Sequence, residues 1–270
     1  MNILNIEHIS KIYGEKVIFD DVSLGIHSGD KIGVIGVNGT GKTTLLKIIA
    51  KINEPDKGQI ICGNGIRVSY LPQNPEFPKK QSILEYVMDG KEHQDWKTES
   101  EAKTILTKLG IYDFDEGCDH LSGGQKKRVA LARTLVDPTE VLILDEPTAV
   151  LTPQETEKLF RVLRKMRDDG KAIVIITHKM HEVKSLSDRV AVLRGGRYIG
   201  SLVTKDTDVN TMTDMMVGHA VTLNIERPEP VNPKPRIEVE GLTVRNEEGI
   251  VKLKDVSFTA NSGEILGIAG

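Results

Sequence analysis

Residues 36–43 carry the clearest chemistry in the sequence. They read Gly-Val-Asn-Gly-Thr-Gly-Lys-Thr and fit the pattern G-x-x-x-x-G-K-[ST]. Glycines let backbone N–H groups turn inward around a triphosphate, while Lys42 can reach its β- and γ-phosphates and Thr43 can ligate Mg²⁺. We therefore expect the phosphates of a nucleotide to be bound by Gly36, Asn38, Gly39, Thr40, Gly41, Lys42, Thr43 and Thr44.

A pair of carboxylates at 145–146 supplies a second element. Four aliphatic residues precede Asp145 and Glu146, so a buried strand is predicted to end at the pair. Doubly wound sheets bind their ligands at this end of their strands. We expect Asp145 to hold Mg²⁺ through water and Glu146 to act as the general base on an attacking water.

A second glycine-containing turn, Leu121-Ser-Gly-Gly-Gln125, precedes a helical pattern at 129–136. The start of a helix attracts anions, and glycines let them approach the backbone. One nucleotide does not need two such sites from one domain. The economical interpretation is that this turn closes on a nucleotide held by another copy, and the alternative is an ordinary helix N-cap with flexible glycines.

Alternating strand and helix patterns must position these residues. Buried strands are predicted at 31–36, 141–145 and 172–177, and helices at 43–52 and 155–168. Such alternation is typical of an α/β fold with a mainly parallel sheet.

Residues 74–120 differ in composition from the rest of this region. They hold 11 Asp and Glu against 6 Lys and Arg, and the spacing of Ile105, Leu106 and Leu109 is helical. We interpret them as a helical insertion on the sheet domain. Their acidity repels phosphate backbones, and the whole chain has a net charge of −3, so a nucleic-acid partner is not favoured.

The composition narrows the class of protein further. Hydrophobic residues make up 39% of the chain, which is enough to form a core and excludes disorder for most of it. Cys62 and Cys118 read as reduced thiols. The N-terminus lacks the pattern of a signal peptide, and aliphatic runs stay far below the ~20 residues that span a bilayer, so we expect the chain itself to be soluble.

The sequence also repeats itself. Asp21-Val-Ser23 recurs 234 positions later as Asp255-Val-Ser257, and Gly36 ends a strand pattern that recurs up to Gly270. Residues 221–236 lie between the copies and contain four prolines, which is typical of an extended linker.

We therefore expect a domain at 1–220, a linker at 221–236, and the start of a second copy, cut short, at 237–270. The second piece stops at the counterpart of Gly36 and has no counterpart of Lys42, so it is not expected to bind a nucleotide. With so little chain it should be poorly ordered or pack on a neighbour.

Together these motifs resemble the nucleotide-binding subunit of ATP-binding cassette (ABC) proteins. The phosphate loop, Leu121–Gln125, Asp145-Glu146 and His178 follow one another in the order of that family. The resemblance covers 1–220 fully and 237–270 as the start of a second cassette. It implies a P-loop NTPase cassette with an antiparallel β subdomain, ATP and Mg²⁺ as ligands, and a dimer of cassettes, formed by two chains or by the second half of a longer protein.

The resemblance also implies roles for single residues. Tyr13 would stack on adenine, although a half-buried strand tyrosine is the alternative. Gln73 would contact Mg²⁺ or the attacking water and sense a membrane partner, where a plain loop glutamine is the alternative. His178 would contact the γ-phosphate, unless it is a core residue ending its strand. The γ-phosphate on the opposite cassette would be gripped by Ser122, Gly123, Gly124 and Gln125.

Two branches of the family are represented in the chain. Residues 1–140 resemble the soluble ABC-F group, which acts on ribosomes, and residues 147–270 resemble ATPases of sugar or nucleoside importers. The change falls near Glu146, in a stretch that both groups resemble, so a chimeric sequence is one interpretation. Thr152 stands where many cassettes have Asp, which keeps a regulatory or inactive ATP-binding module as a further alternative.

The short, proline-rich linker and the acidic insertion favour the importer branch. That branch implies membrane permease subunits as direct partners and a substrate-binding protein as an indirect one. It places the chain in the cytoplasm, peripherally on the inner face of the cell membrane.

Overall fold

The computed structural model describes residues 1–90, 96–219, 232–246 and 249–268. The chain divides into two compact units, Met1–Val221 and Thr222–Gly270, and each is described by itself. Within the described residues, every helix is too short or too polar to cross a bilayer.

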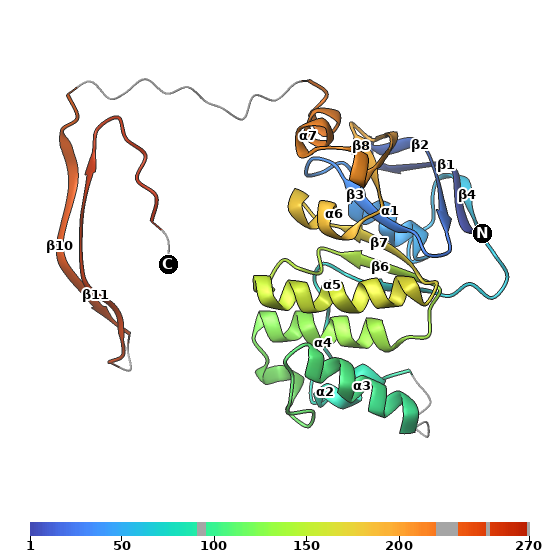
Figure 1. Cartoon of the computed structure of the whole chain (residues 1–270), viewed down its shortest axis with the longest axis horizontal. Coiled ribbons are helices and arrows are strands. Elements are labelled where there is room, and N and C mark those ends of the chain that lie inside the picture. The colour runs from blue at the N-terminus through green and yellow to red at the C-terminus, as the bar shows by residue number, and fades with distance from the viewer. Residues whose placement is uncertain (91–95, 220–231, 247–248, 269–270) are drawn as a thin grey trace. The chain divides into compact units, whose positions relative to one another are not determined.

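A six-stranded sheet forms the centre of the first unit (Figure 1), in the order β5-β6-β7-β3-β8-β9. Neighbouring strands are parallel except β9, which is antiparallel to β8. Every position of β3, β6 and β7 is buried, as expected where layers cover both faces of a parallel sheet. The strands are β3 (Lys31–Ile35), β5 (Val68–Leu71), β6 (Val141–Asp145), β7 (Ala172–Ile176), β8 (Arg189–Arg194) and β9 (Arg197–Val203).

A second sheet in this unit is antiparallel, with the order β2-β1-β4. Its strands are β1 (Asn2–Tyr13), β2 (Lys16–His27) and β4 (Lys57–Cys62). Helix α1 (Lys42–Ile49) shares one hydrophobic cluster with both sheets. The predicted α/β fold, with a mainly parallel core sheet and an antiparallel subdomain, is confirmed.

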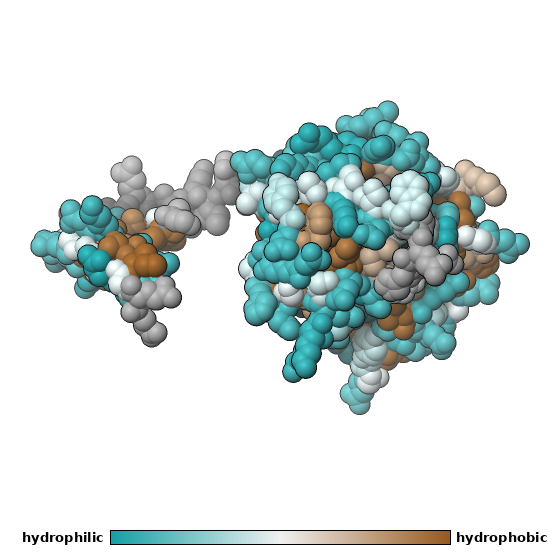
Figure 2. All heavy atoms as spheres, turned by 90° about the horizontal axis from the view of Figure 1, so that it is seen from below, coloured by the Kyte–Doolittle hydropathy of each residue, from teal (hydrophilic) through white to brown (hydrophobic). Residues whose placement is uncertain are grey.

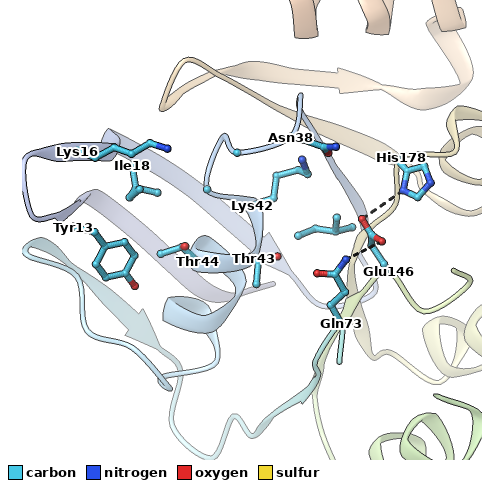
Figure 3. Close-up of a pocket in the computed structure, with 13 residues that line it drawn as sticks. Tyr13, Lys16, Ile18, Asn38, Lys42, Thr43, Thr44, Gln73, Glu146 and His178 are labelled. Atoms are coloured by element: carbon cyan, nitrogen blue, oxygen red, sulfur yellow. Dashed lines mark hydrogen bonds and ion pairs between the residues drawn. The ribbon is translucent and has the colours of Figure 1, made fainter. Parts of the chain in front are cut away.

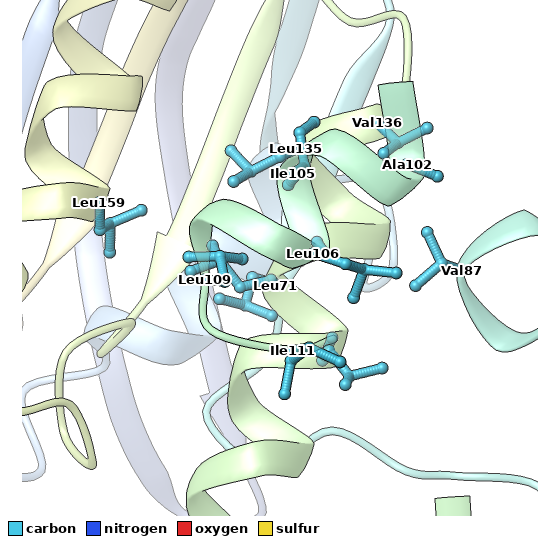
Figure 4. Close-up of a cluster of buried hydrophobic side chains, with 14 of the residues drawn as sticks. Leu71, Val87, Ala102, Ile105, Leu106, Leu109, Ile111, Leu135, Val136 and Leu159 are labelled. Atoms are coloured by element: carbon cyan, nitrogen blue, oxygen red, sulfur yellow. The ribbon is translucent and has the colours of Figure 1, made fainter. Parts of the chain in front are cut away.

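The helical part of the first unit is larger than the predicted insertion at 74–120. Helices α2 (Ile83–Met88), α3 (Trp96–Lys108) and α4 (Gly123–Val136) form one cluster with a face of the central sheet and with α5 (Pro153–Asp168) (Figure 4). Leu135 and Val136 of α4 are buried in it, so the helical region reaches residue 136. The remaining elements of the unit are η1 (Cys118–His120), α6 (Met180–Leu186), η2 (Thr204–Asp206) and α7 (Val209–Val217).

Three helix ends differ from their predicted positions, and each difference has a local cause. The helix predicted at 43–52 ends at Ile49, and Lys51 just after it has a φ of 57°. Helix α4 begins at Gly123 because Ser122 and Gln125 form a capping box. Helix α5 begins at Pro153 because Thr152 and Glu155 form another one.

The described part of the second unit is a hairpin of β10 (Pro235–Arg245) and β11 (Val251–Asn261). The segment expected to be poorly ordered is therefore a regular antiparallel pair over these residues. Most of the predicted linker lies outside the described residues, and its last two residues, Pro235 and Arg236, already belong to β10. A proline is compatible with the first position of a strand, where its missing N–H is tolerated.

The repeat in the sequence extends to the backbone of the hairpin. In β1–β2 the N–H of His8 donates to Oγ of Ser23 at 2.9 Å, and in β10–β11 the N–H of Gly241 donates to Oγ of Ser257 at 2.9 Å. Asp21 and Asp255 have φ angles of 55° and 53°. Hydrophilic residues cover most of the face of the first unit that Figure 2 shows. The hairpin exposes apolar side chains, among them Ile237, Leu242, Val244 and Leu253.

Candidate functional site

A cavity of about 700 Å³ opens above the loop between β3 and α1 (Figure 3). The loop fits only with glycine at two positions. A Cβ on Gly36 would lie 2.4 Å from the carbonyl oxygen of Leu193, and one on Gly41, whose φ is 86°, would lie 2.5 Å from Cγ2 of Ile18. The cavity is lined by Tyr13, Lys16, Ile18, Asn38, Gly39, Gly41, Lys42, Thr43, Thr44, Gln73, Glu146, Ile176 and His178.

Lys42 is the cation at the centre of this loop. Its ammonium donates to the carbonyl oxygens of Gly36 at 2.8 Å and Val37 at 3.0 Å. Burial lowers the pKa of Lys42, and the charges of Glu146 and Asp145 oppose that effect. The positive charge of this half-buried ammonium can neutralise a phosphate. The backbone N–H groups in the first turn of α1 can donate to the same phosphate.

Asp145 lies at the end of β6 and is buried, with 1% of its surface exposed. Burial raises its pKa, whereas hydrogen bonds from the side chains of Thr43 and Tyr70 lower it. The hydroxyl of Tyr70 donates to Oδ2 of Asp145 at 3.3 Å, and burial raises the pKa of that phenol. A Thr hydroxyl beside a carboxylate is the oxygen donor set that Mg²⁺ prefers, with phosphates and waters as its other ligands. The residues present therefore fit the ion.

Glu146 lies between Gln73 and His178 (Figure 3). Nε2 of Gln73 donates to Oε2 of Glu146 at 3.2 Å, and Nδ1 of His178 lies 3.4 Å from Oε1. The three residues follow β5, β6 and β7, which are neighbours in the sheet, so parallel pairing brings them together. Two polar side chains therefore hold the carboxylate of Glu146 at the cavity, which is a position that a general base could use.

The backbone of Glu146 has a φ of 49°, in the left-handed region that L-residues rarely adopt. Its N–H donates to the carbonyl oxygen of Ile176 on β7 at 3.0 Å. A non-glycine residue in this conformation costs about 1–2 kcal/mol, and such strain is concentrated at functional sites. The neighbouring strand therefore holds the carboxylate in place against a backbone preference.

Tyr13 lies at the other end of the cavity from Glu146 (Figure 3). Its ring is half exposed, its hydroxyl accepts from Nδ2 of Asn53 at 3.2 Å, and Lys11 lies 5.5 Å from its centroid. Lys16 and Ile18 from β2 line the same end. The sequence pointed to Tyr13 alone. Tyr13 pairs with Lys16 across the β1–β2 hairpin, and recognising this pairing is the signal that could have identified Lys16 and Ile18 as lining residues.

Other predicted residues lie outside the cavity wall. The hydroxyl and N–H of Thr40 both donate to the carbonyl oxygen of Val37, so Thr40 holds the loop together. Gly36 accepts from Lys42, and Asp145 lies beneath the lining. The structure brings Gly36, Thr40 and Asp145 next to the cavity, but none of the three is among the residues that line it.

The turn at 122–125 caps α4 and is separate from the cavity wall. Ser122 Oγ accepts from the N–H of Gln125 at 3.3 Å, and Gln125 Oε1 accepts from the N–H of Ser122 at 3.0 Å. A Cβ built on Gly123 meets no described atom within 4 Å, and one on Gly124 comes within 3.7 Å of Val150 O. The side chains of Ser122 and Gln125 therefore cap the helix, both glycines present open backbone, and the binding role of this turn stays a prediction.

Lys127 is a buried cation that the sequence analysis missed. It is 4% exposed, and its ammonium donates to the carbonyl oxygens of Pro72, Gln73 and Asp145 at 3.0, 2.7 and 3.2 Å. Its position one turn after Ser122 in α4 gave no signal of this burial, because lysine is common on helix surfaces.

Known proteins share both the sequence and the fold. Residues 19–149 match the family model described as ABC transporter. The chain is 32% identical over 288 residues to the ribose import ATP-binding protein RbsA of Caldanaerobacter subterraneus subsp. tengcongensis, and 30% identical over 287 residues to that of Corynebacterium glutamicum. Each match covers 99% of this chain but 57% and 54% of the relative, so the chain spans little more than half of their length.

Among solved structures, one described as the ATP-binding subunit of an ABC transporter superposes with a TM-score of 0.73 at 20% identity. It covers 80% of this chain and 99% of its own, and it establishes the fold. The sequence matches and the shared fold point to the same family as the order of motifs from the phosphate loop to His178. The chain therefore belongs to the ATP-binding cassette family.

Proposed function

We propose that this chain binds and hydrolyses ATP and uses the energy to drive an importer of simple sugars or nucleosides. The observation that carries the proposal is the placement of Glu146 between Gln73 and His178 at one edge of the phosphate cavity. The two relatives named as ribose import proteins support the transport part, because their similarity spans 99% of this chain.

The positions of the side chains support the following hydrolytic step. Loop N–H groups and Lys42 bind the β- and γ-phosphates, and Tyr13 stacks on the base. A water oriented by Gln73 and His178 attacks the γ-phosphorus, its proton passes to Glu146, and the bond to the β-phosphate oxygen breaks to give ADP and phosphate. Thr43, Gln73 and Asp145 would hold Mg²⁺, which supplies charge neutralisation on the phosphates when bound.

The open backbone at Gly123 and Gly124 supports a site completed by a second cassette. In this proposal the start of α4 binds the γ-phosphate of a nucleotide seated on the facing cassette, with Ser122 and Gln125 fixing the turn. The facing cassette comes from a second chain or from the other half of a longer protein. ATP then joins two cassettes, and hydrolysis releases them.

The partners proposed for the importer are membrane permease subunits, with a substrate-binding protein acting indirectly. Gln73 lies where the sheet meets the helical part of the unit, so a permease contact there would be felt at Glu146. This places the chain in the cytoplasm, peripherally on the inner face of the membrane. The acidic composition of residues 74–120 does not favour nucleic acid, which is what the ribosome-acting alternative would require.

The test compares wild type with Glu146→Gln and Lys42→Ala. Glu146→Gln should keep ATP binding, lose steady-state phosphate release by a hundredfold or more, and accumulate a dimer with ATP in gel filtration. Lys42→Ala should lose ATP affinity. Unimpaired turnover in Glu146→Gln, or an unchanged dissociation constant in Lys42→Ala, would refute the assignment. Stimulation of ATPase by a co-expressed permease, against stimulation by ribosomes, separates the two branches.

A further inference from the structure

The ammonium of Lys127 joins three segments that lie far apart in the sequence. A lysine ammonium has three N–H donors. Here three backbone carbonyls accept them, from Pro72, Gln73 and Asp145. A buried cation that donates to carbonyls on the loop after β5 and at the end of β6 fixes both segments relative to its own helix, because each bond is charge-assisted.

Each of these segments carries a part of the proposed hydrolytic site. Gln73 itself donates to Oε2 of Glu146, and Glu146 directly follows Asp145. Helix α4 begins at Gly123 after its cap Ser122, so Lys127 lies on the second turn of the helix whose start would bind the facing nucleotide. A shift of α4 along its axis would pull on the loop after β5 and on the end of β6, because Lys127 donates to both.

A neutral residue of similar length at position 127 would remove the ammonium that donates to the carbonyl oxygens of Pro72, Gln73 and Asp145. It would also remove a positive charge from beside the acidic pair Asp145 and Glu146.

We propose that Lys127 is a positioning residue that transmits engagement of the α4 start with a facing nucleotide to Gln73 and Glu146 of its own cassette. The inference rests on the proposed function. It makes the two sites of a cassette dimer depend on each other through one side chain, since the turn that binds one nucleotide and the residues that hydrolyse the other share this ammonium.

The test uses the full chain, four single variants at positions 126 and 127, the variant Gln73→Ala, and the double variant Lys127→Met/Gln73→Ala. Lys127→Met removes the donors at nearly constant length, Lys127→Gln keeps a polar group and guards against failure of Lys127→Met to fold, and Lys127→Arg keeps charge and donors. The matched control is Lys126→Met, which removes the charge of the neighbouring lysine. The ammonium of Lys126 lies 6.0 Å from the centroid of the Phe77 ring. Circular dichroism confirms folding, and kcat and the dissociation constant of a fluorescent ATP analogue are measured.

We expect kcat to fall about tenfold or more in Lys127→Met and Lys127→Gln, with ATP affinity within about twofold of wild type, because Lys127 lies behind the cavity wall. Lys127→Arg should recover part of the rate, and Lys126→Met should match wild type. The Hill coefficient for ATP should fall towards one. The effect of Gln73→Ala on kcat should be smaller in the Lys127→Met background than alone, because both act on Glu146.

Two results overturn the inference. One is a kcat in Lys127→Met and Lys127→Gln equal to that of Lys126→Met, and the other is full additivity with Gln73→Ala. A wild-type chain that binds ATP without hydrolysing it would instead overturn the proposed function, so the two failures are distinguishable.

Discussion

Alanine at Gly41 is expected to destabilise the phosphate loop far more than alanine at Gly39. Both residues have left-handed backbones, with φ of 86° and 82°. The Cβ on Gly41 would lie 2.5 Å from Cγ2 of Ile18 and 3.0 Å from Cδ1 of Phe19, whereas the one on Gly39 meets no described atom within 4 Å. The two substitutions therefore share a conformational cost and differ in steric overlap.

The expected free energies follow from those contacts. An L-residue in the left-handed region costs about 1–2 kcal/mol, which applies to both variants. Overpacking against well-packed neighbours adds about 1–3 kcal/mol, which applies to Gly41→Ala alone because Phe19 is fully buried. We expect the free energy of unfolding to fall by about 1–2 kcal/mol in Gly39→Ala and by about 2–5 kcal/mol in Gly41→Ala, the latter a large fraction of the ~5–15 kcal/mol that is typical of a folded protein.

Urea denaturation followed by circular dichroism, without nucleotide, measures both values. The double variant Gly41→Ala/Ile18→Ala removes Cγ2 of Ile18 and should lose less than the two single changes added together. Equal losses for Gly39→Ala and Gly41→Ala, or strict additivity with Ile18→Ala, would contradict the steric argument. In either case β2 would not be what shapes the loop.

The remaining predictions concern three side chains near the site. The N–H of Thr152 holds the pKa of Glu155 below its ordinary value. This carboxylate therefore stabilises the fold at pH values above its pKa in the unfolded chain, and the effect is lost as pH falls through its pKa in the folded chain. Glu155→Gln should flatten the acid side of a curve of unfolding free energy against pH. Tyr70→Phe removes a donor to Asp145, raises the pKa of that carboxyl further, and should weaken Mg²⁺-dependent ATP binding severalfold in a Mg²⁺ titration. His178→Ala should lower the single-turnover rate about tenfold to a hundredfold at nearly constant ATP affinity, and an unchanged rate would exclude it from the hydrolytic step.

The sequence predicts the polar edge of the central sheet well, because its signals are local. Asp145, Glu146 and His178 each end a strand whose aliphatic run is readable, and parallel strands present those ends together. Gln73 followed from the family pattern, and the structure brings it to within 3.2 Å of Glu146. Their chemical roles stay predictions.

Features that depend on contacts distant in sequence were not predictable in the same way. The burial of Lys127 is decided by carbonyls 54 and 55 positions earlier in the chain, on a loop with no pattern of its own. The wall formed by Lys16 and Ile18 depends on how β2 crosses the phosphate loop. The early start of α4 was missed because two glycines weaken a helical pattern, while the capping box that overrides them pairs Ser122 with Gln125.

The left-handed backbone of Glu146 sets a limit on how this protein can be improved. Glycine at that position would remove the backbone penalty, so Glu146→Gly is a change that selection for thermal resistance alone would accept. The same change would delete the carboxylate that lies between Gln73 and His178 and whose backbone is bonded to β7. Selection for heat tolerance alone, in a natural lineage or in a laboratory screen that does not measure ATP turnover, would therefore favour a more stable protein that lacks this carboxylate.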